Sequence, residues 1–329
     1  MLPFVSEGIK IMDCKSDFIA VSIICNAYNH ELYIRDALES FVMQRTSFTF
    51  EVLVHDDAST DKTADIIREY EAKYPDIIKP IYQTENQYTK GGVTRFQEPR
   101  IKGKYVAFCE GDDYWTDPYK LQKQYDVMEA HPEVDICAHS AIKINAENKQ
   151  QIAVIAPRNK DCIISTEDVI YGEGGFVATN SLFYRAELYS KNYEFRKILR
   201  LDYTLQILGS LRGGMLYLSD YMSAYRYMVP GSWTSNYVKD EKKQEALFEK
   251  KQKMLDSLNR ETAYKYGNII KKRMLKNEAA RLIEKNELKE VLKKKYREVL
   301  KDYSFIFRLK LLLKAYFPFL VTLKNKLRK

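Results

Sequence analysis

The stretch FIAVSIICNAYNHELYIRDALESFVMQ (residues 18–44) predicts a buried strand followed by an amphipathic helix. Residues 18–28 are a nearly continuous apolar and β-branched run, which is typical of a strand buried on both faces of a sheet. In residues 30–44 the apolar side chains instead recur at helical spacing. A buried strand that leads into such a helix is the usual first unit of an α/β fold.

The same alternation continues along the chain. Three further apolar runs are expected to be strands: residues 50–57, 77–84 and 104–110. Residues 59–75 predict an amphipathic helix with Ser59 or Thr60 as its N-cap. Strands and helices that alternate with short links imply parallel pairing and right-handed crossovers. We therefore expect a Rossmann-like, mostly parallel sheet flanked by helices.

Length and composition are those of a globular protein. A chain of 329 residues with 45% hydrophobic and 13% aromatic residues can hold one large domain, or a domain with an appendage. The five cysteines are scattered and show no C-x-x-C spacing, which favours reduced thiols in the cytoplasm over disulfides or a zinc site. Residues 1–17 are expected to be an N-terminal extension, and they lack the pattern of a signal peptide.

Charge divides the chain into an acidic body and a basic tail. Residues 240–329 contain 26 Lys and Arg against 12 Asp and Glu, which leaves 27 against 33 in residues 1–239. A basic tail could bind nucleic acid or an anionic membrane, or it could simply be a solvated helical face.

Polar side chains follow three of the expected strands, in the segments CNAYNH, HDDAST and EGDDYW. Parallel strands bring their carboxyl ends to one edge of the sheet, where ligands bind in such folds. Five acids are then expected to share one cleft: Asp56, Asp57, Glu110, Asp112 and Asp113. Convergent carboxylates suit Mg²⁺ or Mn²⁺ that carries substrate phosphates. The alternative is a set of solvated turns, because Gly-Asp-Asp is also favourable in turns.

Residues 21–44, 50–67 and 103–124 resemble the opening motifs of glycosyltransferase family 2, in the same order and at similar spacing. The likeness extends over about residues 18–235. It implies a GT-A fold and inverting transfer of a sugar from a nucleotide-diphospho-sugar, with a UDP-sugar favoured and Mn²⁺ or Mg²⁺ as cofactor. The implied acceptor is a hydroxyl group of a glycan or of a lipid-linked molecule in bacterial surface polysaccharide synthesis.

The resemblance also assigns residues on the donor side. It implies that four residues contact the donor nucleotide: Asn26, Tyr28, Asn29 and Asp57. Glu110 and Asp112 occupy the family's Asp-x-Asp position, and Asp113 follows directly. Glutamate replaces the first aspartate here, which favours Asp112 and Asp113 over Glu110 as contacts to the metal and the ribose.

On the acceptor side, residues 172–189, which include Asn180, resemble the family's acceptor loop, although a glycine-rich turn before a strand is the alternative.

Asp202 lies where the family carries its catalytic aspartate; alternatively it is only a helix N-cap. Inverting transfer needs a base for the acceptor hydroxyl, and a metal-bound carboxylate is a poor base. Arg226 is expected at the diphosphate or on the surface, and Trp233 on a sugar face or at the domain edge.

Residues 236–329 are expected to form a basic helical region. No window of about 20 uncharged residues occurs, so we expect no transmembrane span. Residues 303–329 combine aromatic side chains with Lys310 and Lys314 one turn apart, which suits a helix at the inner face of the cell membrane. The alternative is a helix packed on the catalytic domain of a cytoplasmic protein.

Two other classes compete with the transferase interpretation. A sugar-phosphate nucleotidyltransferase shares a related α/β design, but its glycine-rich loop follows the first strand, whereas GGVTRF here is residues 91–96. A non-catalytic nucleotide- or nucleic-acid-binding module is the other alternative. Carboxylates that line a cleft would repel phosphates without a metal, so we expect no nucleic-acid partner.

Overall fold

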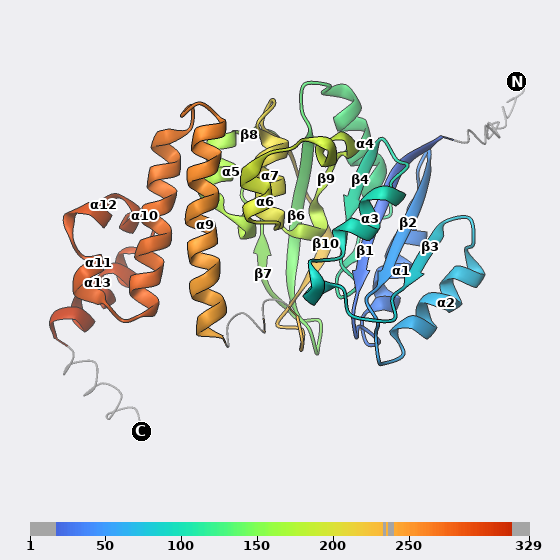
Figure 1. Cartoon of the computed structure of the whole chain (residues 1–329), viewed down its shortest axis with the longest axis horizontal. Helices are drawn as coiled ribbons and strands as arrows, with labels where there is room; N and C mark the ends of the chain where they lie inside the picture. Colours follow the sequence, from blue (N-terminus) through green and yellow to red (C-terminus); the bar gives the residue numbers. More distant parts are fainter. Residues whose placement is uncertain (1–17, 233–234, 236–239, 318–329) are drawn as a thin grey trace, which may run out of the picture.

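The computed structural model describes residues 18–232, 235 and 240–317, and it shows a mixed sheet with helices on both faces (Figure 1). Within the described residues the strand order is β3-β2-β1-β4-β9-β6-β10-β5, with β7 beside β6 and β8 beside β10. The ten strands are β1 (Ile19–Ala27), β2 (Thr49–Asp56), β3 (Ile78–Tyr82), β4 (Tyr105–Phe108), β5 (Tyr114–Trp115), β6 (Ile136–Asn145), β7 (Gln151–Ile155), β8 (Cys162–Ile164), β9 (Phe183–Arg185) and β10 (Met215–Tyr227).

The predicted parallel unit is confirmed for the first four strands. β1 pairs in parallel with both β2 and β4, and β3 extends β2 in the same direction. Beyond β4 the sheet becomes mixed, because β9 pairs antiparallel with both β4 and β6. β10 then pairs in parallel with β6 and antiparallel with β5.

Helices cover both faces of this sheet and continue beyond it. The α-helices in the described residues are α1 (Ile34–Val42), α2 (Thr63–Lys73), α3 (Thr94–Gln97), α4 (Lys120–Ala130), α5 (Thr166–Gly172), α6 (Glu194–Ile198), α7 (Asp202–Ser210), α9 (Glu241–Glu261), α10 (Gly267–Glu284), α11 (Leu288–Val291), α12 (Arg297–Leu300) and α13 (Phe305–Tyr316). Short 3₁₀ turns lie between them: η1 (Tyr88–Lys90), η2 (Glu98–Arg100), η3 (Gly174–Phe176), η4 (Thr179–Ser181), η5 (Ala186–Ser190) and η6 (Lys294–Tyr296).

Two hydrophobic cores explain the continuous apolar run of β1. Successive side chains of a strand point to opposite faces. Val21 and Ile23 therefore join the core under α1, α2 and α4. Ile24 joins the core under α5, α6, α7 and α9 on the other face. Because both faces are covered by helices, almost every residue of β1 is apolar.

The predicted start of α2 is wrong by about one turn. The helix begins at Thr63, whose N–H donates to Asp61 Oδ1 at 2.9 Å. Ser59 Oγ accepts the N–H of Asn29 at 3.0 Å, and the Thr60 N–H donates to Asn29 Oδ1 at 2.8 Å. Residues 59 and 60 thus tie the loop after β2 to the loop after β1, and they do not cap the helix.

The C-terminal helices form an appendage beside the sheet domain, and α9 stands between that domain and the remaining helices (Figure 1). Met254, Leu255 and Leu258 of α9 belong to the core under α5–α7. The later helices surround a separate core, to which α13 contributes Leu311. α9 and the start of α10 therefore pack on the sheet domain. The described part of residues 303–329, α13, packs on the appendage and not on the catalytic domain, so the packed-helix alternative does not describe it.

Two further sequence expectations concern the membrane and the cysteines. Among the described residues, none of the helices combines the length and the apolar character that crossing a membrane requires. The four cysteines in the described part of the chain are free thiols, as the scattered spacing predicts.

Candidate active site

The carboxyl ends of β1, β2 and β4 meet at one edge of the sheet, as predicted. The N–H of Asp57 donates to the carbonyl of Ala27 and that of Gly111 to the carbonyl of Asn26, each at 2.9 Å. The Asp57 and Gly111 segments therefore continue the pairing beyond the strands. A Cβ atom at Gly111 would lie 2.9 Å from His30 Nδ1, so a larger residue here would force the His30 side chain to shift.

A cleft of about 740 Å³ opens on the side of the sheet covered by α6 and α7. Of the residues expected to bind the donor, the metal or the acceptor, three line this cleft: Asn26, Glu110 and Asp202. The cleft therefore brings the acidic end of β4 together with the aspartate that lies far away in sequence. Of the five acids at the strand ends, Glu110 is the one that lines the cleft itself.

Glu110 and Asp112 form a pair of carboxylates that repel each other. Neither side chain makes a hydrogen bond or an ion pair with any described residue. Glu110 is exposed to solvent, although it is one of the residues that line the cleft. Desolvation by the cleft raises its pKa to about 8, with further contributions from the negative charges of Asp112 and Asp202. The raised pKa means that the pair resists a second negative charge, and neither carboxylate has a cationic partner within the described chain.

Asp113 points the other way and is almost fully buried. Its Oδ1 accepts the backbone N–H of Arg226 at 2.7 Å, and its Oδ2 accepts Nδ2 of Asn180 at 3.1 Å. Asn180 is also buried and donates to the Ala224 carbonyl at 3.0 Å. These residues form a hydrogen-bonded connection between the Glu110–Asp113 turn and β10, behind the cleft wall.

Arg226 also lies in this buried layer, because it is only 3% exposed. Its guanidinium donates from Nη1 to the Asp112 carbonyl at 2.6 Å and forms an ion pair with Asp36 of α1. The rings of Tyr33 and Tyr114 lie against the same guanidinium. Arg226 thus ties β10 and α1 to the acidic turn. Trp233 lies outside the described residues.

Asp57 is expected from the sequence to contact the nucleotide of the sugar donor. In the structure it holds the loop that follows β3. Its Oδ1 accepts the backbone N–H of Gln87 at 2.7 Å and its Oδ2 that of Tyr88 at 3.0 Å. Tyr88 lines the cleft, so Asp57 acts on the cleft through this loop. Asn29 has a left-handed backbone (φ 55°), and its side chain joins the loop after β1 to the loop after β2. Tyr28 is 44% exposed.

Asp202 is the first residue of α7 and lies in the cleft wall. Its Oδ2 accepts the hydroxyl of Thr179 at 2.8 Å, and its Oδ1 accepts the N–H of Tyr203 at 2.7 Å. Burial raises the pKa of Asp202, although these two hydrogen bonds and the charge of Lys251 oppose the shift. The carboxylate therefore accepts one of the free N–H groups at the start of α7 and also lines the cleft.

Glu173 and Lys251 are two of the cleft-wall residues that the sequence reasoning did not single out. Glu173 follows α5 and forms ion pairs with Lys251 of α9 and Arg273 of α10. Burial alone would raise the pKa of Glu173, but the charges of Arg273 and Lys251 outweigh it and hold the pKa below its usual value. Lys251 lies in the basic tail among many other lysines. The one signal in the sequence that could have pointed to its role is Glu173, an acidic residue between glycines that could pair with a lysine.

The residues of the acidic turn fit a divalent cation that also binds phosphate. Within the described ranges, no group of three or more His, Cys, Asp or Glu side chains is arranged to hold a metal ion. Mg²⁺, however, is commonly held by one or two carboxylates, with substrate phosphates and waters as the remaining ligands. The unpaired carboxylates of Glu110 and Asp112 meet that requirement.

Comparisons with known proteins concern the family and the fold of the chain. Residues 22–208 match the family model described as Glycosyl transferase family 2. The chain is 36% identical over 221 residues to the uncharacterized protein Rv1520 of Mycobacterium tuberculosis, which covers 66% of this chain and 61% of that protein. It thus spans less than two thirds of the length of this curated relative.

Two further comparisons concern named transferases. The chain is 38% identical over 111 residues to the UDP-Glc:alpha-D-GlcNAc-diphosphoundecaprenol beta-1,3-glucosyltransferase WfaP of Escherichia coli, covering 33% of this chain and 41% of that one. It superposes on S. aureus TarS 1-349 in complex with UDP-GlcNAc with a TM-score of 0.60 and 17% identity, covering 86% of this chain and 80% of that chain. The family match over more than half of the chain and the shared GT-A fold show that this protein belongs to glycosyl transferase family 2.

Proposed function

We propose that the protein transfers a sugar from a UDP-sugar to a hydroxyl group of a glycan or lipid-linked acceptor in the synthesis of a bacterial surface polysaccharide. The observation that carries the proposal is the cleft in which Glu110, beside Asp112, and the separate carboxylate of Asp202 both lie. The relatives support the substrates, because WfaP is named for a UDP-Glc donor and a diphosphoundecaprenol acceptor. UDP-GlcNAc is the ligand in the TarS complex.

In this proposal Asp202 is the general base. It accepts the proton of the acceptor hydroxyl while that oxygen bonds to the anomeric carbon and the bond from this carbon to the diphosphate oxygen breaks. The attack comes from the face opposite the leaving group, so the anomeric configuration inverts. The Thr179 hydroxyl and the Tyr203 N–H hold the carboxylate in place. A raised pKa makes Asp202 a stronger base than an ordinary aspartate.

Glu110 and Asp112 would hold Mn²⁺ or Mg²⁺, which supplies positive charge to the departing diphosphate. The geometry supports this pair over Asp113, because both oxygens of Asp113 already accept hydrogen bonds. Asn26 and Tyr28 remain the proposed contacts to the nucleotide. Four other predicted site residues are better explained as positioning residues: Asn29, Asp57, Asn180 and Arg226.

The direct test is hydrolysis of a panel of nucleotide sugars by the full chain, with Mn²⁺ and with EDTA. We expect slow release of a nucleoside diphosphate from one UDP-sugar, and only in Mn²⁺. A nucleotidyltransferase would instead release pyrophosphate from a nucleoside triphosphate and a sugar phosphate, and a binding module would release neither. Either result would refute the proposal.

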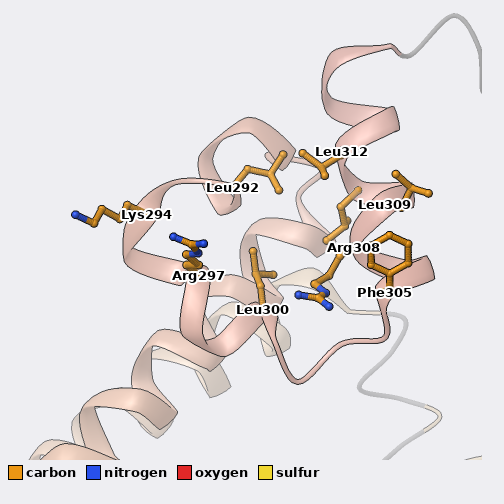
Figure 2. A pocket seen from close by; sticks show the side chains of 9 residues that line it. Leu292, Lys294, Arg297, Leu300, Phe305, Arg308, Leu309 and Leu312 are labelled. Carbon is orange, nitrogen blue, oxygen red and sulfur yellow. The ribbon is translucent and has the colours of Figure 1, made fainter.

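We also propose that the appendage binds an anionic membrane surface, where a lipid-linked acceptor would be presented. A groove of about 500 Å³ lies between α12 and α13, and Figure 2 shows Arg297 and Arg308 on either side of Leu300 within it. Lys294, Arg297 and Arg308 form no ion pair or side-chain hydrogen bond with a described residue. Several apolar side chains of α13 are exposed: Phe305, Ile306, Leu309, Leu312, Leu313 and Tyr316. Cations beside exposed apolar residues suit anionic lipid headgroups above an acyl boundary.

A further inference from the structure

The cleft contains a second group of charged side chains, distinct from the acidic pair. Arg196 of α6 and Arg200, two residues after that helix, both line the cleft. Glu98, Tyr184 and Tyr189 line the cleft beside them and interact electrostatically with Arg196. Neither arginine was singled out by the sequence pattern, because basic residues around a short helix are common on any protein surface.

The N–H groups of the Arg196 guanidinium have no hydrogen-bond acceptor in the described part of the chain. Its guanidinium makes no hydrogen bond or ion pair with any described residue, and Nη1 is buried without an acceptor. Arg200 is exposed to solvent and also forms no ion pair or side-chain hydrogen bond within the described chain. A buried donor without an acceptor costs free energy. Such a donor in a cleft wall is explained if a ligand supplies the missing acceptor.

The neighbouring lysines show that these two arginines are exceptional. Lys191 lines the same cleft but pairs with Asp135 at 2.9 Å. Lys197 also lines it and pairs with Glu194 at 2.6 Å. Among the described lysines and arginines that line the cleft, the unpartnered ones are thus the two guanidiniums, and Glu98 interacts electrostatically with both of them. The cluster keeps a net positive charge even when Glu98 is ionised.

The two charged groups occupy different parts of the cleft. The charges that act most strongly on Glu110 are those of Asp112 and Asp202. Those that act on Arg196 are Glu98 and Arg200. Tyr184 and Tyr189 beside it are neutral phenols, because burial raises their pKa values. A ligand that reaches both groups must therefore extend along the cleft, from the acidic turn and Asp202 to the arginines.

We propose that Arg196 and Arg200 form a phosphate-binding subsite for the acceptor, which therefore carries a phosphate at a distance from the hydroxyl that accepts the sugar. This inference rests on the proposed transfer, in which Asp202 marks the position of that hydroxyl. Guanidinium groups are planar and present paired donors, which match two oxygens of a phosphate. The donor diphosphate would lie at Glu110 and Asp112 with its cation, so the arginines are left for a second anionic group.

The test is calorimetric titration of the full chain with phenyl phosphate, in saturating UDP and Mn²⁺ so that the donor end is occupied. We expect measurable binding, and a loss of at least about tenfold in affinity in each of Arg196→Gln and Arg200→Gln, the scale of a lost charge-assisted hydrogen bond. The affinity for UDP should stay unchanged in both variants. Lys191→Gln and Lys197→Gln are the matched controls, and they should bind phenyl phosphate normally. Benzoate should bind more weakly than phenyl phosphate if the subsite selects phosphate over carboxylate.

Four outcomes would overturn the inference: absence of phenyl phosphate binding to the UDP-bound protein, equal losses in the lysine controls, benzoate binding as tight as phenyl phosphate, or a loss of UDP affinity in the arginine variants. The last would assign the arginines to the donor diphosphate. Failure of the proposed transfer gives a different result. A protein that binds phenyl phosphate through Arg196 but turns over no UDP-sugar refutes the transferase proposal and keeps the anion site.

Discussion

Lys251 of α9 forms an ion pair with Glu173 of the loop after α5, and both side chains line the cleft. The other carboxylate oxygen of Glu173 accepts Nη2 of Arg273 at 2.5 Å. The backbone of Glu173 has φ 68° and ψ −176°, a region that residues other than glycine rarely adopt, at a cost of about 1–3 kcal/mol. Two cations from the appendage thus hold a strained residue beside Asp202, which makes the appendage part of the cleft wall.

The first prediction is that Lys251→Met lowers sugar transfer by about tenfold, which corresponds to a loss of about 1.4 kcal/mol. The substitution leaves Glu173 with one cation and removes a positive charge that lowers the pKa of Asp202. A base works in its deprotonated form, so a higher pKa moves the acid limb of the pH–rate profile to higher pH. Lys250→Met, at the exposed neighbouring position, is the control. Equal effects in both variants, or an unmoved acid limb, would contradict this role.

The second prediction concerns Asp202. We expect Asp202→Asn to lower transfer by at least about 10²-fold, the usual effect of losing a general base. Binding of UDP should change little, because the donor contacts lie at the strand ends. The amide can still accept from the Thr179 hydroxyl, so the fold should be retained. Rates with a saturating acceptor, together with calorimetry on UDP, check both parts. Near-normal turnover would show that Asp202 only caps α7.

The sequence predicted the first half of the fold well, because local signals and packing agree there. In β1 a continuous apolar run identifies a strand with helices on both faces, and the polar residues after it mark the ligand edge. The C-terminal half gives weaker signals. β9 has three residues, and β10 shifts register against β6 between Leu218 and Tyr221, which breaks the alternation of apolar and polar side chains.

The roles within the acidic turn could not be read from the sequence. Asp112 and Asp113 are adjacent, and the motif fits either of them as the buried, hydrogen-bonded aspartate; the structure shows that this residue is Asp113. The donors that satisfy the buried carboxylate of Asp113 come from Arg226 and Asn180, which lie far away in sequence. The Lys251–Glu173 pair spans a similar separation. Such contacts depend on how β10 and α9 pack, which no local pattern encodes.

The third prediction is that UDP binding requires Mn²⁺ held by Glu110. Glu110→Gln should weaken UDP binding in Mn²⁺ and leave the residual affinity in EDTA unchanged, because a neutral amide is a poorer ligand for a hard cation. Asp65→Asn on the exposed face of α2 removes the same charge and is the control. Calorimetry that gives the wild type equal UDP affinities in Mn²⁺ and EDTA would exclude the metal assignment.

The fourth prediction is that the full chain floats with phosphatidylglycerol vesicles and not with phosphatidylcholine vesicles. Binding should weaken in high salt, since the Debye length falls from about 10 Å at 0.1 M to about 3 Å at 1 M. Reversing the charge of both Arg297 and Arg308 to Glu should abolish flotation. Lys242→Glu with Lys253→Glu, on exposed positions of α9, changes net charge equally and should retain most of it. Loss of flotation in both pairs would mean that overall charge, not the groove, governs binding.

The last prediction separates the two neighbouring aspartates. Asp113→Ala should lower the free energy of unfolding by about 1–3 kcal/mol, because it leaves the Arg226 N–H and Asn180 Nδ2 buried with one acceptor fewer. Asp112→Ala removes a carboxylate without a partner that repels Glu110, so the unfolding free energy should stay the same or rise.

Binding should show the opposite pattern, which tests the assignment independently of stability. At a temperature where both variants are folded, we expect Asp112→Ala to lose the Mn²⁺-dependent part of UDP affinity and Asp113→Ala to keep most of it. Urea unfolding and calorimetry on the two proteins provide the two measurements. If Asp113→Ala were stable and failed to bind UDP with Mn²⁺, Asp113 would be the ligand, and the turn would have to rotate its second aspartate toward the cleft when the cation binds.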